Sequence, residues 1–193
     1  MGQNISELVA PVSGGIVIPS SQSVLEILAK RKEEGKYQGA RTVSAKMLNF
    51  LEEEDIGKLV EQSLEPLKDD YFERLAQTKS KVLIEVNNQG IVILDGNYMD
   101  IMAVNPEKRR NGVGSGLMYD TIKLMGELYW RSQPKRDAAN RFYTSLMPNP
   151  NTFKPAEFTS DDGIKYFGYA IGLSPAEFQK AQQFMQQKPK NYR

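Results

Sequence analysis

The stretch Val104–Met118, which reads V-N-P-E-K-R-R-N-G-V-G-S-G-L-M, decides the fold expected for this chain. Upstream of it, Tyr98–Val104 is an apolar run typical of a β-strand. Downstream, apolar or half-polar side chains recur at helical spacing, at Val113, Leu117, Thr121 and Met125. The pattern therefore predicts a strand that turns through a glycine-rich loop into an amphipathic helix.

Such a loop is suited to hold an anion. The first backbone N–H groups of a helix have no partner within the helix, and the positive end of the helix dipole lies beside them. Gly112, Gly114 and Gly116 would let the backbone approach a bulky phosphate, while Arg109 and Arg110 would add charged donors. The sequence therefore predicts a diphosphate site, although both arginines could also be ordinary surface charges.

Two common phosphate loops do not fit this stretch. A kinase-type P-loop requires Lys and then Ser or Thr after its last glycine, and no lysine follows Gly114 or Gly116. A dinucleotide-binding turn requires Gly-x-Gly-x-x-Gly directly after a strand. Here the order is Gly-x-Gly-x-Gly, and Pro106 and two arginines precede it.

The stretch resembles the signature of the GNAT superfamily of N-acetyltransferases, which is Arg/Gln-x-x-Gly-x-Gly/Ala after a strand that ends in Val-x-Pro. Val104-x-Pro106 and Arg109-x-x-Gly112-x-Gly114 match its fixed positions. Downstream, Asp137–Tyr143 resembles the Asn-x-x-Ala-x-x-Phe-Tyr helix of the family. Its alanine, phenylalanine and tyrosine match Ala139, Phe142 and Tyr143, whereas its asparagine falls at Arg136, with Asn140 nearby.

The resemblance covers about residues 80–172. It implies an α/β (α+β) fold, the GNAT acyl-CoA N-acyltransferase fold, with a central, mostly antiparallel mixed sheet flanked by helices. An enlarged helical N-terminal part and a C-terminal helix would be additions. We therefore expect a flexible lead-in at residues 1–14 and then one domain, 15–193. The three parts of this domain are 15–79, 80–172 and 173–193.

The implied activity is acetyl-CoA-dependent transfer of an acetyl group to a primary amine in a ternary complex. By resemblance, main-chain groups of Met102 and Val104 would pair with the pantetheine arm of acetyl-CoA. The pyrophosphate would be surrounded by Arg109, Arg110, Asn111, Gly112, Val113, Gly114 and Ser115. The family also implies cofactor contacts from Arg136 and Asn140. Lys135, Arg136 and Arg141 could meet the adenosine 3′-phosphate or be ordinary solvated residues.

Three residues are candidates for proton transfer. Tyr143 matches the tyrosine that often protonates the leaving thiolate in the family, but it could instead be a packed aromatic residue. Asp100 lies two residues after Tyr98, the register position where some relatives carry a glutamate, so it is a candidate base or a carboxylate bonded to a neighbour. Glu85, on an earlier strand, is the next candidate.

The composition limits the available chemistry. The 193 residues include no histidine and no cysteine, which excludes His-based triads, thiolate nucleophiles, disulfides and Cys- or His-ligated metal centres. Direct acetyl transfer meets this limit because it needs no protein nucleophile, and we predict no metal. A net charge of +1 gives no field that would favour nucleic acid or an anionic membrane as a partner.

No apolar run is long enough to span a membrane and the start lacks signal-peptide character, so we expect a cytoplasmic (intracellular) protein. The start Met1–Ser6 matches the N-myristoylation pattern at Gly2, although such a short pattern also occurs by chance. The amine acceptor is of unknown size, and a homo-oligomer or larger assembly remains open.

The remaining pattern predicts the other elements in outline. A strand at 15–19 and a helix capped by Ser20–Ser23 would open the domain, followed by helices at 42–53, 56–64 and about 67–75. The acidic patch 52–55 would either attract an amine or end a solvated helix. Later elements are a hairpin of strands at 82–86 and 91–94, strands at 128–131 and 164–171, and a helix opened by the capping box at Ser174.

A second function fits the same fold. The missing strand glutamate, the arginine at position 136 and the enlarged N-terminal part favour a GNAT fold retained for assembly, for example in a phage particle. Such a protein would be catalytically weak or inactive.

Overall fold

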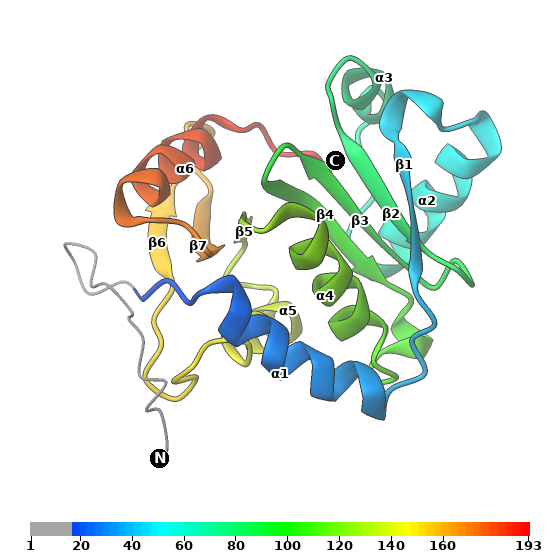
Figure 1. Cartoon of the computed structure of the whole chain (residues 1–193). Coiled ribbons are helices and arrows are strands. Elements are labelled where there is room, and N and C mark those ends of the chain that lie inside the picture. The colour runs from blue at the N-terminus through cyan, green and yellow to red at the C-terminus, as the bar shows by residue number, and fades with distance from the viewer. Residues whose placement is uncertain (1–16) are drawn as a thin grey trace.

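The computed structural model describes residues 17–193 and places seven strands in one sheet of order β1-β2-β3-β4-β5-β7-β6. Figure 1 shows α1 and α4 against one face of the sheet and α2 and α3 at the other. The strands are β1 Ala40–Ser44, β2 Lys81–Glu85, β3 Gly90–Asp95, β4 Tyr98–Val104, β5 Leu128–Ser132, β6 Ala156–Thr159 and β7 Lys165–Ile171. The α-helices are α1 Ser21–Glu34, α2 Phe50–Ser63, α3 Tyr71–Ala76, α4 Val113–Met125, α5 Asp137–Thr144 and α6 Pro175–Gln187. Two short 3₁₀ helices are η1 Ala45–Met47 and η2 Pro106–Lys108.

The sheet consists of two antiparallel halves that meet at one parallel contact. Strands β1 to β4 pair antiparallel in chain order, and β7 pairs antiparallel with both β5 and β6. Within residues 17–193, β4 and β5 pair only at Tyr98 and Tyr129. Beyond that point the two strands diverge, so the edge of β4 that faces β5 lacks a strand partner from the described part of the chain over Met99–Val104. The expected mostly antiparallel mixed sheet is confirmed.

A β-bulge interrupts β4 at Asp100. Ile101 pairs with Ile93 and Met99 pairs with Leu94, so Asp100 is an extra residue without an opposite partner on β3. A bulge bends the strand locally and redirects side chains. The bulge therefore explains why Met99 packs in the core cluster with α4, whereas Ile101 packs in the cluster with α2 and α3.

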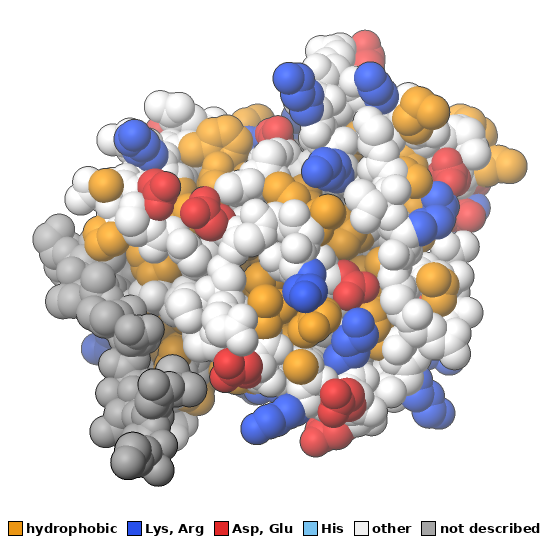
Figure 2. All heavy atoms as spheres, viewed as in Figure 1, with side chains coloured by type: hydrophobic (Ala, Val, Ile, Leu, Met, Phe, Trp, Pro, Cys, Tyr) orange, Lys and Arg blue, Asp and Glu red, His pale blue; other side chains and the backbone are white. Residues whose placement is uncertain are grey.

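The core is divided by the sheet. One cluster joins α1 and α4 to the sheet through side chains such as Leu28, Leu117 and Trp130, and a second joins α2 and α3 through Val60, Tyr71 and their neighbours. A third cluster packs α6 against β6 and β7 through Phe178, Phe158 and Tyr166. Figure 2 shows acidic and basic side chains interspersed on the face that carries α1 and α4.

The N-terminal part differs from the sequence prediction. Residues 17–20 form no strand, and the first strand of the sheet lies after α1 instead. The single helix predicted at 42–53 is wrong: its first residues form β1, and α2 begins only after Asn49, whose side chain accepts a hydrogen bond from the N–H of Glu52. Thr42 and Val43 are β-branched and pair with β2, so sheet pairing overrides the helical spacing.

Most later elements are confirmed, including the β2–β3 hairpin, α4, β5 and the capping box of α6. Strand β6 was not anticipated, because it follows a loop rich in proline and asparagine. Glu52 closes the capping box of α2 and pairs with Arg41 at 2.8 Å, so this member of the acidic patch has a structural role.

The lead-in 1–14, the Gly2 pattern and residues 15 and 16 of the predicted first strand lie outside the described residues. None of the helices in 17–193 is long and apolar enough to cross a membrane.

Gly116 should be a stability determinant rather than a ligand contact. A Cβ atom built there would lie 2.1 Å from the ring of Tyr37, which is buried in the core cluster that includes α1 and α4. We expect Gly116→Ala to lower the free energy of unfolding by about 1–3 kcal/mol through overpacking. Gly57→Ala in α2 is the matched control, since its Cβ would meet only Phe72 at 4.0 Å. This control should be stabilising by about 0.5–1 kcal/mol. Urea unfolding would measure the stability of both variants. Equal midpoints for Gly116→Ala and Gly57→Ala would contradict the packing argument.

Candidate active site

The start of α4 forms an anion cradle. Gly112 is the N-cap with a left-handed φ of 79°, and no side chain within the described structure caps this helix. The first helical bond runs from the N–H of Gly116 to the carbonyl of Gly112 at 2.8 Å. The N–H groups of Val113, Gly114 and Ser115 therefore precede the helical ladder and are available to an anion.

The three glycines have different roles. A Cβ atom on Gly112 would lie 2.7 Å from the Cα of Gly35, so the loop and the end of α1 touch backbone to backbone. Lys36 N–H also donates to the Asn111 carbonyl at 2.9 Å, which fixes this contact. A Cβ on Gly114 would meet Met102 at 3.5 Å, an ordinary contact. Gly112 and Gly116 are thus required by their protein surroundings as well, whereas Gly114 has no such requirement.

The two arginines lie on the loop but differ in conformation. Arg109 donates from Nη2 to the Ser63 carbonyl at the end of α2, at 3.0 Å, and the Ser63 hydroxyl donates to the Val104 carbonyl at 3.0 Å. Arg110 is exposed, and its backbone is left-handed with φ 69°. Arg109 therefore ties α2 to the loop, while Arg110 remains at the surface beside the cradle.

A cleft opens where β4 and β5 diverge. Its walls come from β4, β5, α5 and the segment after α6. The lining residues are Leu64, Tyr98, Met99, Asp100, Ile101, Met102, Trp130, Arg131, Ser132, Gln133, Arg136, Ala139, Tyr143, Tyr166, Lys190, Asn191 and Tyr192. Two proton-transfer candidates, Asp100 and Tyr143, are thus brought together with Met102.

Asp100 is held by donors on both carboxylate oxygens. The Tyr71 hydroxyl donates to Oδ2 at 2.9 Å, and Asn191 Nδ2 donates to Oδ1 at 2.8 Å. Tyr71 is buried in α3, and its pKa is raised by burial and by the charge of Asp100, so it remains a donor. The bulge and these two contacts fix the carboxylate at the cleft wall.

Tyr143 also lines the cleft, where it lies among aromatic rings. Its ring centroid is 5.0 Å from that of Trp130 and 5.3 Å from that of Tyr169. Burial raises the pKa of Tyr143 above its ordinary value of 10.0, and Tyr169 adds to this effect. The phenol therefore stays protonated at neutral pH, as a proton donor must, and it also packs in the core.

Two buried polar groups on β5 have no partner within the described residues. They are Trp130 Nε1 and the Ser132 hydroxyl, and both residues line the cleft. Trp130 is 1% exposed and Ser132 is 5% exposed. Buried polar groups are nearly always hydrogen-bonded in native proteins, so the cleft is suited to a polar ligand. The uncapped cradle and these orphan groups together fit a long, polar, diphosphate-bearing ligand.

Two predicted site residues have other surroundings. Glu85 is buried at the end of β2, where its carboxylate accepts from the N–H groups of Asn87 and Gln89 at 2.9 and 3.2 Å. It closes the β2–β3 turn and is not among the cleft residues. Asn140 donates to the Gln133 carbonyl at 2.9 Å and accepts from the Tyr169 hydroxyl at 3.2 Å, so both ends of its amide are engaged within the protein.

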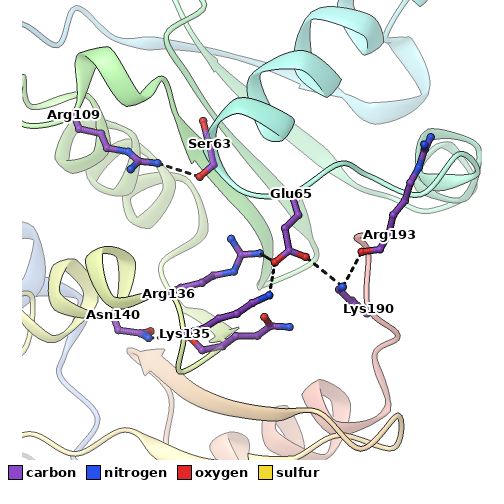
Figure 3. A network of polar contacts seen from close by, with 9 residues as sticks. Ser63, Glu65, Arg109, Lys135, Arg136, Asn140, Lys190 and Arg193 are labelled. Carbon is purple, nitrogen blue, oxygen red and sulfur yellow. Dashed lines mark hydrogen bonds and ion pairs between the residues drawn. The ribbon is translucent and has the colours of Figure 1, made fainter.

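Arg136 belongs to an ion-pair cluster that spans the cleft (Figure 3). Glu65, between α2 and α3, is 2.7 Å from Lys135, 3.3 Å from Arg136 and 3.3 Å from Lys190. The guanidinium of Arg136 also lies 4.9 Å from the ring centroid of Tyr192. Three cations thus share one carboxylate across the cleft, which leaves this region positively charged. Sequence reasoning missed Glu65, because its partners are far away in the chain.

The cluster should make stability depend on pH. Partial burial raises the pKa of Glu65, but the ammonium groups of Lys135 and Lys190 outweigh this and hold it below its ordinary value of 4.5. A lowered folded-state pKa stabilises the protein above the unfolded-state pKa, and this contribution is lost as pH falls through the folded-state pKa. We expect Glu65→Gln to lower the urea midpoint near pH 7 but not near pH 3. If the urea midpoint of Glu65→Gln were still lower than that of wild type near pH 3, packing rather than charge would cause the difference.

The strand order, the bulge in β4, the divergence of β4 and β5 and the uncapped glycine loop after β4 identify the architecture. This chain has the GNAT fold. No protein-family model matches the sequence, and no curated protein matches it significantly. GNAT-fold solved structures similar to this chain include the ribosomal-protein-S18-alanine N-acetyltransferase from Escherichia coli, with 17% identity, a TM-score of 0.46, and coverage of 70% of this chain and 96% of that one.

Two further GNAT-fold structures show the same level of similarity. A putative GNAT acetyltransferase from Desulfovibrio desulfuricans has 14% identity and a TM-score of 0.49, with coverage of 70% of this chain and 99% of that one. The spermidine/spermine N-acetyltransferase from Vibrio cholerae has 11% identity and a TM-score of 0.43, with coverage of 74% and 96%. Within residues 17–193 of this GNAT fold, no group of three or more acidic, His or Cys residues could hold a metal ion.

Proposed function

We propose that this protein is an acetyl-CoA-dependent N-acetyltransferase that transfers the acetyl group directly to a primary amine. The observation that carries the proposal is an uncapped cradle at Gly112–Ser115 beside Met102, which lines the cleft that holds Asp100 and Tyr143. The cradle would hold the pyrophosphate of acetyl-CoA through backbone N–H groups. The diverging edge of β4 at Met102 and Val104 would accompany the pantetheine arm.

Acetyl-CoA supplies an activated acetyl thioester. An amine reaches the cleft mostly as an ammonium ion, so it must lose a proton before its nitrogen can form the new C–N bond. Asp100 is the candidate acceptor of that proton because its carboxylate is fixed at the cleft wall. The C–S bond breaks as the amide forms, and Tyr143 is the candidate donor to the leaving thiolate. The second proton that the nitrogen loses then restores the Tyr143 phenol. This step needs no metal and no protein nucleophile.

The direct test is calorimetric titration of acetyl-CoA into the protein, followed by a thiol-release assay with a panel of amines. We expect binding, and thiol release that depends on the amine and falls in Asp100→Asn. Binding without thiol release from any amine would overturn the enzymatic proposal. No acetyl-CoA binding would overturn the cradle as well.

A second function, assembly without turnover, is favoured by two observations. Both oxygens of Asp100 already accept hydrogen bonds from the protein, and Arg136 is paired with Glu65 across the cleft. A site closed in this way could persist in a GNAT fold retained as a structural component. Robust turnover with any amine in the panel would exclude assembly as the principal role.

A further inference from the structure

The segment Lys190–Arg193, called the strap below, binds the cleft as an extended peptide would. Tyr192 forms an antiparallel bridge with Leu67. The N–H of Lys68 donates to the Asn191 carbonyl at 2.9 Å, and the N–H of Arg193 donates to the Pro66 carbonyl at 3.0 Å. Two main-chain hydrogen bonds around one residue pair are the pattern by which an added strand docks on an exposed backbone edge.

The side chains of the strap enter the catalytic cleft. Lys190, Asn191 and Tyr192 all line it together with Asp100 and Tyr143. Asn191 is 7% exposed, and its Nδ2 donates to Asp100 Oδ1 at 2.8 Å. The strap thus presents a nitrogen with its hydrogen atoms to the candidate base.

The strap also makes charged and aromatic side-chain contacts of a kind that another polypeptide could make. Lys190 pairs with Glu65 at 3.3 Å, and the ring of Tyr192 lies under the Arg136 guanidinium at 4.9 Å. Arg193 also pairs with Asp69. Main-chain pairing, two ion pairs and one aromatic contact would each be available to a different chain if the strap moved away. An amide nitrogen such as that of Asn191 is not nucleophilic, so the strap can occupy this place without reacting.

On these grounds we propose that the amine acceptor is an extended polypeptide, which pairs with Pro66–Lys68. We further propose that the strap occupies the acceptor position in the free protein, where Asn191 Nδ2 marks the place of the acceptor nitrogen. This inference rests on the proposed acetyltransferase function for its catalytic part. Its binding part can be tested without turnover.

The binding test uses a fluorescent peptide, Gln-Lys-Pro-Lys-Asn-Tyr-Arg, which copies residues 187–193. We expect the full-length double variant Asn191→Ala/Tyr192→Ala to bind it at least about tenfold more tightly than wild type, because the internal competitor is weakened. A peptide with alanine in place of its asparagine and tyrosine should not bind. Gln183→Ala, an exposed position of α6, is the control variant and should bind like wild type.

Equal peptide binding by wild type and the double variant, or none by either, would overturn the proposal provided that the variant still melts cooperatively and binds acetyl-CoA. If the variant does not fold, hydrogen exchange in the wild-type protein tests whether the strap opens locally. The amides of Lys68 and Arg193 should then exchange through a local opening. Exchange only by global unfolding would make the strap a permanent part of the fold and would overturn the proposal.

The catalytic test replaces the asparagine of the peptide with lysine, which places an amine where Asn191 lies. With acetyl-CoA, the double variant should release thiol at least about tenfold faster with this peptide than with free lysine at equal concentration. Equal rates would overturn polypeptide recognition. Peptide binding without thiol release from any amine would instead refute the proposed acetyltransferase activity, so the two failures are distinguishable.

Discussion

A Gly114→Asp variant should bind acetyl-CoA about 100-fold more weakly than wild type, a loss of about 2.7 kcal/mol. Gly114 lies in the first turn of α4, among the N–H groups that no side chain of residues 17–193 caps. A carboxylate there would repel a diphosphate at close range, and like charges about 4 Å apart cost roughly 4 kcal/mol at an effective dielectric constant of 20. Isothermal titration of acetyl-CoA measures the change.

The variant should nevertheless fold, because aspartate in the first turn of a helix is favourable to the helix dipole. Gly114→Ala is the matched control: its Cβ would meet Met102 at 3.5 Å and Val104 at 3.8 Å, which are ordinary contacts. We expect the alanine variant to bind like wild type. Unchanged affinity in the folded aspartate variant would show that the cradle does not hold the cofactor.

Gly112 would be a poor choice for the same test. Its φ of 79° and its contact with the backbone of Gly35 mean that any side chain strains the junction of α1 with the loop. Loss of binding in a Gly112 variant would therefore mix a folding defect with an electrostatic one. The sequence alone places all three glycines in one motif, and only the surrounding structure separates their roles.

The fold could be predicted where its signals are local. The loop from Val104 to Gly114, the β2–β3 hairpin and the capping box at Ser174 each depend on residues within a few positions of one another, and each is confirmed. Strand β1 could not be predicted, because the spacing at 42–53 suits a helix and only pairing with β2 makes residues 40–44 extended.

The site was predictable in part for the same reason. Asp100 and Tyr143 were identified from strand register and from a helix motif, and both line the cleft. The bulge at Asp100 has no sequence signal, because it is defined by pairing with β3. The partners that decide how Asp100 is held, Tyr71 and Asn191, are 29 and 91 residues away in the chain. No periodicity links residues at such separations.

Tyr143→Phe should lower kcat about 100-fold or more while leaving acetyl-CoA affinity unchanged, because general acid catalysis typically contributes a factor of this size. The phenylalanine ring can keep the contacts with Trp130 and Tyr169, whose centroids lie 5.0 and 5.3 Å away. The change therefore removes the hydroxyl without opening a cavity. Thiol release under saturating acetyl-CoA measures kcat, and calorimetry measures affinity.

The pH profile separates an acid from a packed aromatic residue. Burial raises the pKa of Tyr143 above 10.0, and a general acid is active below its pKa. The wild-type kcat should therefore not fall on the alkaline side up to about pH 10, whereas Tyr143→Phe should be slow throughout. Tyr119→Phe, on the partly exposed side of α4, is the control and should match wild type. If the Tyr143 variant also matched wild type in kcat and pH profile, the Tyr143 hydroxyl would not be the group that protonates the thiolate. A water held near Trp130 Nε1 and the Ser132 hydroxyl would then become the better candidate donor.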